Sequence, residues 1–113
     1  MTLTGKAKEQ FEHYLSGVFK RGYSSWSRLS DFYSLPDSMQ WGMYQDFADS
    51  VGFIVNVYCN ASGYLYEIHR NSNYGGTHLH DSGYEADTES GAWYTVESSR
   101  EAAIKKLDEI LNK

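Results

Sequence analysis

Cysteine and long apolar runs are scarce in this sequence, and each shortage excludes a class of protein. Because Cys59 is the one cysteine, the chain cannot form an internal disulfide, which suits a reducing compartment. No stretch reaches the roughly 20 apolar residues that a membrane-spanning helix needs. The first residues also lack the apolar segment of a secretory signal peptide. We therefore expect a cytoplasmic protein that makes no contact with a membrane.

Positive charge is also scarce, above all in the middle of the chain. Residues 31–97 contain ten Asp and Glu residues but a single basic one, Arg70, and the whole sequence has a net charge of −5. Proteins hold phosphate backbones mainly through Lys and Arg, so direct binding to nucleic acid is not expected. A partner protein with a basic surface is a better electrostatic match. The alternative, that the acidic charge only keeps the protein soluble, stays open.

Aromatic residues are abundant by contrast. The sequence is 41% hydrophobic and 16% aromatic, with ten tyrosines among its 113 residues. This composition can form a core and excludes global disorder. The length is that of one domain, so we treat residues 1–113 as a single α+β domain.

Hydrophobic periodicity predicts three helices and three strands. Apolar residues at helical spacing predict helices over residues 3–20, 36–51 and 98–113. Runs of β-branched and aromatic residues predict strands over residues 53–59, 64–69 and 92–97, with the first two joined as a hairpin. The order α-α-β-β-β-α predicts a three-stranded antiparallel sheet packed against helices. Its other face, or a strand edge, is then available to a partner.

The predicted helix ends carry recognisable local signals. Asp37 with Gln40, and Ser98 with Glu101, have the spacing of a capping box at the start of a helix. Gly52 is placed to end the helix over residues 36–51.

Residues 70–91 are rich in Gly, Ser, Asn and Asp and show no regular pattern, so we expect a long connection there. Connections of this length in a compact domain are often functional. Its acids and tyrosines are the candidate partner-binding residues: Asp81, Glu85, Asp87, Glu89, Tyr74 and Tyr84.

The same segment contains the one cluster that resembles a metal site. If it is extended, His78 and His80 point the same way, since side chains alternate along a strand. Two imidazoles with Asp81 can ligate zinc, and His69 is a further candidate. The pattern is unspecific, however, because the sequence has no His-Glu-x-x-His and no Cys-x-x-Cys motif. We therefore expect no metal and no cofactor.

Nucleophilic catalysis has weaker support. Cys59 is expected to share a strand face with Phe53, Val55 and Val57, where a cysteine acts as a small hydrophobe. No serine lies in a Gly-x-Ser-x-Gly context, and no phosphate-binding loop is present. The sequence thus predicts no catalytic residues and no enzymatic activity.

Two strings in the second predicted helix, LPDSMQWG (residues 35–42) and YQDFADSVG (residues 44–52), resemble small proteins encoded by bacteriophages and prophages. SREAAI (residues 99–104) adds a more generic match, and the resemblance covers roughly residues 7–58 and 92–113. No activity is established for that group, so it implies no catalytic residue. It implies a phage accessory protein that acts by binding, for which blocking a host defence nuclease, including a CRISPR effector, is a recurrent role.

The leading hypothesis is therefore an acidic protein, cytoplasmic in a bacterial host cell, that binds and inhibits or modulates a host protein. Its most concrete form is an anti-defence, anti-CRISPR-like inhibitor of a nucleic-acid-binding effector. Two alternatives stay open. One is a metal-binding module or small metal-dependent hydrolase using His78 and His80, and the other is a small-molecule binder whose aromatics stack on a nucleotide base. A homodimer that buries a second apolar stripe of helix 36–51 is compatible with each.

Overall fold

The computed structural model describes residues 1–20, 29–71, 76–81 and 92–113, without the side chains of residues 19 and 20. Its helices and strands, in chain order, are α1 (Gly5–Lys20), α2 (Leu29–Tyr33), α3 (Asp37–Ser50), β1 (Phe53–Asn60), β2 (Gly63–Arg70), β3 (His78–Asp81) and α4 (Val96–Leu111). The three strands form one antiparallel sheet in the order β1-β2-β3. The predicted α+β class with a three-stranded antiparallel sheet is confirmed, and the short α2 is an addition to it.

The β1–β2 hairpin is confirmed, and it brings a distant part of the chain alongside its turn. β1 and β2 pair from Phe53 opposite Arg70 to Asn60 opposite Gly63. Next to the turn, Tyr64 and Trp93 exchange two backbone hydrogen bonds of 2.9 and 2.8 Å. Gly63 has a φ of +133°, and a Cβ there would lie 2.5 Å from the Trp93 carbonyl oxygen. Only glycine permits this close approach.

The predicted third strand over residues 92–97 is wrong. β3 lies instead at His78–Asp81, inside the segment expected to be a long connection. Of residues 92–97, only Trp93 forms a bridge to the sheet, and Val96 and Glu97 belong to α4. The extended pattern ends early because Thr95 caps the helix that follows.

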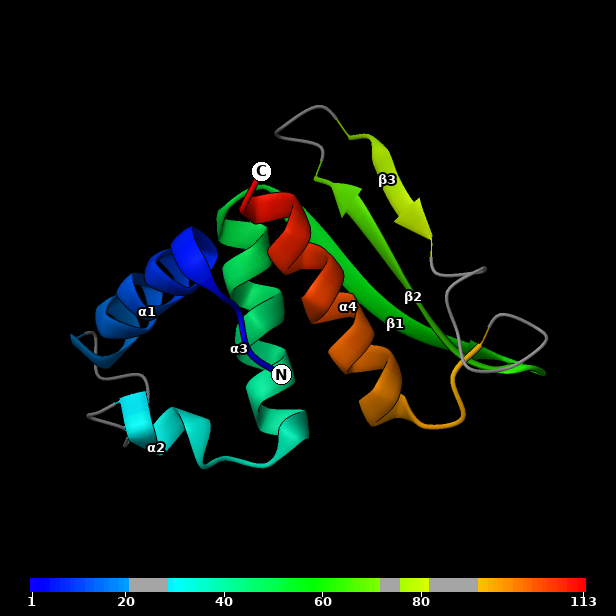
Figure 1. Ribbon diagram of the computed structural model, residues 1–113, viewed down its shortest axis with the longest axis horizontal. Helices are drawn as coiled ribbons and strands as arrows, with labels where there is room; N and C mark the ends of the chain where they lie inside the picture. Colours follow the sequence, from blue (N-terminus) through cyan, green and yellow to red (C-terminus); the bar gives the residue numbers. More distant parts are fainter. Residues whose placement is uncertain (21–28, 72–75, 82–91) are drawn as a thin grey trace.

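The helices form a layer on one face of the sheet. Figure 1 shows α3 and α4 side by side against the strands, with α1 on the far side of α3 from the sheet. The core between these elements is built on aromatic contacts: the Phe11 and Tyr44 rings stack with centroids 4.5 Å apart, and Phe32 and Phe47 meet Phe11 edge-on. All four side chains are buried. Cys59, expected to be buried, is exposed, because burial along β1 falls toward the hairpin turn.

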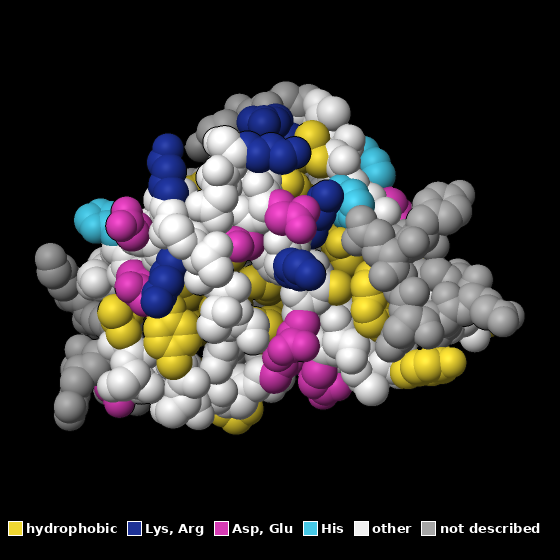
Figure 2. All heavy atoms as spheres, viewed as in Figure 1, with side chains coloured by type: hydrophobic (Ala, Val, Ile, Leu, Met, Phe, Trp, Pro, Cys, Tyr) yellow, Lys and Arg dark blue, Asp and Glu magenta, His cyan; other side chains and the backbone are white. Residues whose placement is uncertain are grey.

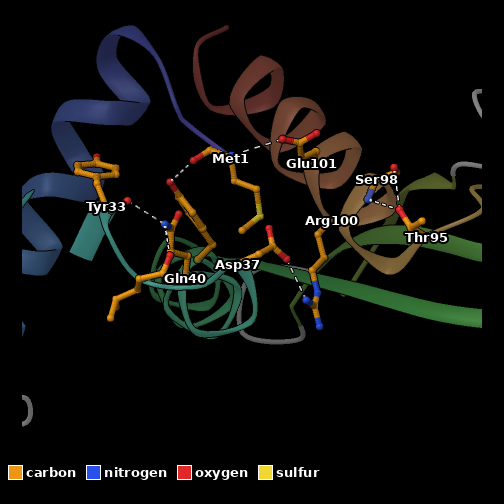
Figure 3. Close-up of polar contacts among 10 residues, drawn as sticks. Met1, Tyr33, Asp37, Gln40, Thr95, Ser98, Arg100 and Glu101 are labelled. Carbon is orange, nitrogen blue, oxygen red and sulfur yellow. Dashed lines mark hydrogen bonds and ion pairs between the residues drawn. The ribbon is translucent and has the colours of Figure 1, made fainter. Parts of the chain in front are cut away.

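Both predicted capping boxes are wrong, and Figure 3 shows what replaces the first of them. Asp37 accepts no hydrogen bond from the start of α3 and instead accepts one of 2.9 Å from Arg100 of α4. Gln40 turns back and donates to the carbonyl oxygens of Tyr33 and Leu35. The polar residues at the start of α3 therefore bind neighbouring segments and not their own helix.

At α4 the cap lies one turn earlier than predicted. The Thr95 hydroxyl accepts a hydrogen bond of 3.1 Å from the Ser98 backbone N–H, so Thr95 takes the capping position assigned to Ser98. The prediction for the end of α3 is confirmed, since Gly52 directly follows the cap residue and has a φ of +97°.

The start of α1 is capped by side chains from the end of α4. Asp108 accepts two hydrogen bonds of 2.7 Å, one from the Thr4 backbone N–H and one from the Thr4 hydroxyl. The Asn112 Oδ1 atom accepts from the Ala7 N–H at 3.0 Å, while its Nδ2 donates to the Thr4 carbonyl oxygen. Backbone groups that a helix leaves unpaired in its first turn are thus satisfied from another helix.

Removing this cap should destabilise the fold. We expect Asp108→Ala to lower the free energy of unfolding by about 1–2 kcal/mol, because the N-terminus of α1 then loses its charged hydrogen-bond acceptor. Glu109→Ala is the matched control on the same helix. It removes an exposed carboxylate that pairs only with Lys106 in the described part, and should cost less than about 0.5 kcal/mol. Urea denaturation measures both, and equal losses would contradict the assignment.

Candidate functional site on the open face of the sheet

Alternation along β1 and β2 divides the sheet into a helix-facing side and an opposite side, on which Leu65 near the hairpin turn is buried and the remaining residues are exposed or half-buried. Phe53, Val55, Tyr66 and Ile68 point toward the helices and are buried. We call the other face the open face and define it by these residues: Ile54, Asn56, Tyr58, Glu67, His69, His78 and Asp81. Ile54 is 38% exposed and Tyr58 37%, so two large apolar side chains lie at the surface of a rigid element.

The open face carries negative charge beside these apolar groups. Glu67 and Asp81 are cross-strand partners on β2 and β3. The Tyr58 hydroxyl donates to the Asp81 carboxylate at 3.3 Å. Across the three strands the one basic residue is Arg70, whose guanidinium lies over the Phe53 ring on the helix-facing side. In the face drawn in Figure 2, by contrast, Lys and Arg are interspersed with Asp and Glu.

A bulge in β3 brings two histidines together on the open face. His78 pairs with His69, whereas His80 pairs with Ile68, so Leu79 is an extra residue between adjacent positions of β2. The His69 and His78 rings meet edge-on with centroids 4.7 Å apart. The Glu67 carboxylate lies 3.2 Å from the His69 Nε2 atom. One potential ligand atom from each of the three residues lies within 4.8 Å of the others.

The prediction that His78 and His80 point the same way is wrong. The bulge at Leu79 breaks the alternation, and His80 turns to the helix-facing side, where its Nε2 atom lies 3.2 Å from the Tyr66 hydroxyl. Asp81 does not complete a set with these two histidines. The residues brought together are Glu67, His69 and His78.

Of the predicted partner-binding residues, Asp81 lies on the open face. The others fall outside the described residues: Tyr74, Tyr84, Glu85, Asp87 and Glu89. Sequence reasoning did not select Ile54, Tyr58 or Glu67. The period-two pattern of the hairpin could have identified Glu67, because it places Glu67 and His69 on the face opposite the core.

A shallow cleft of about 380 Å³ lies between α4 and Trp93. Lys105 and Lys106 line it together with the aromatic rings of Tyr66 and Trp93, which is the combination a nucleotide would need. Lys106 is already paired with Glu109, 3.4 Å away. The small-molecule hypothesis stays a prediction.

Comparison of the sequence with protein-family models and with curated proteins, and of the structure with solved structures, gives no match. The site is therefore interpreted from its own geometry. Among the described helices, none has the length and hydropathy needed to cross a membrane.

The contact between Tyr58 and Asp81 has a measurable signature. Burial raises the pKa of the Tyr58 hydroxyl above its ordinary value, and the neighbouring Asp81 carboxylate raises it further. We expect Asp81→Ala to lower this pKa while leaving it raised, because burial, the larger cause, remains. A pH titration of the Tyr58 ring resonances by NMR measures the change, with Asp46→Ala on α3 as control. An unchanged pKa in Asp81→Ala would show that the contact is absent in solution.

Proposed function

We propose that the protein is a non-catalytic binding protein whose open face docks on a partner protein with a basic surface. One observation carries the proposal: Ile54 and Tyr58 are exposed beside the carboxylates of Glu67 and Asp81, on a sheet whose open face has no Lys or Arg. Apolar and aromatic groups at the centre of a patch supply binding energy once water is excluded from them. Carboxylates around them select a partner of opposite charge.

The rigid setting of this surface supports a docking role. Ile54 and Tyr58 lie on β1, which is paired along its whole length with β2. Tyr58 is further oriented by its hydrogen bond to Asp81. Side chains held in place before binding lose less conformational entropy on association, so the same contacts yield higher affinity.

In its most concrete form, the partner is a host effector that binds nucleic acid, and the protein occupies its basic channel. Two observations support this version. Residues 31–97 are strongly negative, with ten acidic residues and one basic residue, and the sequence resembles phage accessory proteins. Inhibition would then follow from competition with the phosphate backbone for the same Lys and Arg side chains.

A matched pair of arginine substitutions tests the open face. Ile54→Arg places a long cation on it, whereas Met39→Arg places the same group on α3, where Met39 is 51% exposed. Wild type and each variant are immobilised in buffer containing EDTA, exposed to nuclease-treated lysate of the native host, and analysed by mass spectrometry. We expect a basic protein to be retained stoichiometrically by wild type and Met39→Arg, and at least about tenfold less by Ile54→Arg.

Two results would contradict the proposal. One is equal retention of the same protein by both variants, which would place the contact elsewhere. The other is the absence of any stoichiometric basic partner. If the retained partner is a nuclease, adding the binding protein to the purified enzyme should displace its nucleic acid and lower its activity in proportion to the amount added.

The carboxylate contribution is tested separately with the partner so identified. We expect Asp81→Asn to weaken binding and to reduce its dependence on ionic strength, because one charge pair is lost. Asp46→Asn removes an exposed carboxylate from α3 and should leave the salt dependence unchanged. Affinities measured over a range of salt concentrations decide the matter, and parallel salt curves for wild type and Asp81→Asn would exclude an electrostatic role for Asp81.

A further inference from the structure

We propose that Glu67, His69 and His78 form a binding site for a divalent transition-metal ion on the open face. Two residues come from β2 and one from β3, so the site depends on the pairing of these two strands. The proposal does not depend on a protein partner, because every protein ligand belongs to this chain.

The backbone fixes the relative positions of the three side chains. Glu67 and His69 are two apart on β2 and therefore project from the same face. His78 is the cross-strand partner of His69, and the start of β3 is held by a 2.6 Å hydrogen bond from the Arg70 N–H to the Thr77 carbonyl oxygen. The bulge at Leu79 then gives His78 its direction, which is a known use of bulges beside functional sites.

The distances suit a metal after a small adjustment of the side chains. Around a tetrahedral zinc ion, ligand atoms lie about 3.4 Å from one another, given bonds of about 2.0–2.2 Å. Glu67 and His69 already approach to 3.2 Å, and the widest separation in the cluster is below 4.8 Å. All three side chains are partly or fully exposed, so rotation about side-chain bonds can close the remaining gap.

The donor set determines which ions fit. Two imidazole nitrogens and one carboxylate oxygen suit zinc and other first-row divalent ions better than calcium or magnesium, which prefer all-oxygen sites. Three protein ligands leave at least one coordination position open toward solvent. A water molecule or a donor group from another molecule can occupy that position.

A zinc titration of the tag-free protein tests the site without any partner, so its failure would leave the docking proposal untouched. We expect calorimetry to give one bound Zn²⁺ per chain, and NMR to show shifts of the His69 and His78 ring resonances. Replacing either ligand, in His69→Gln or His78→Gln, should weaken binding by at least about tenfold.

The other two histidines provide matched controls. His80 lies on the opposite side of the sheet and His13 is exposed on α1, so His80→Gln and His13→Gln should retain the wild-type affinity for zinc. Circular dichroism of each variant establishes that it is folded. The proposal is overturned if wild type binds no zinc, if His80→Gln loses binding as His78→Gln does, or if all four variants bind equally.

Discussion

The burial of α3 between α1 and the sheet is the constraint on which the rest of the structure depends. Tyr44 stacks on Phe11 of α1, and Phe47 meets the same ring edge-on. On its other side α3 packs against β1, where Phe53 and Val55 are buried. α4 packs against the same face of the sheet as α3, so the sheet has its apolar partners on a single face. Among the described residues, no helix covers the opposite face.

The sequence was sufficient wherever hydrophobic period and glycine chemistry decided the structure. The helical spacing of Phe11 and Leu15, the β-branched and aromatic run at residues 53–59, and Gly52 after α3 all predicted the elements that are observed. It was insufficient where a side chain had several partners within reach. Local spacing assigned Asp37 to its own helix, yet the guanidinium of Arg100, 63 residues away in sequence, is its partner in the fold. Tertiary contacts of this kind have no local signature.

The candidate site shows the same division. Placing Glu67 and His69 on one face followed from alternation alone, but joining His78 to them required β3 and its bulge. The four-residue strand His78–Asp81 is too short for a periodic pattern, and one extra residue reverses the direction of every side chain beyond it. His80 consequently contacts Tyr66 on the helix-facing side, while His78 reaches the surface. The sequence pattern suggested that His78 and His80 form one site, but His80 packs beside Tyr66 and His78 lies at the surface.

The cap that α4 supplies to α1 has a consequence for the order of folding during synthesis. α1 is synthesised before the groups that satisfy its first turn, because Asp108 and Asn112 follow it by about a hundred residues. Closing a contact across 104 positions costs loop entropy that only an otherwise assembled chain recovers. The start of α1 therefore lacks these hydrogen-bond partners until α4 has been synthesised and has packed beside it.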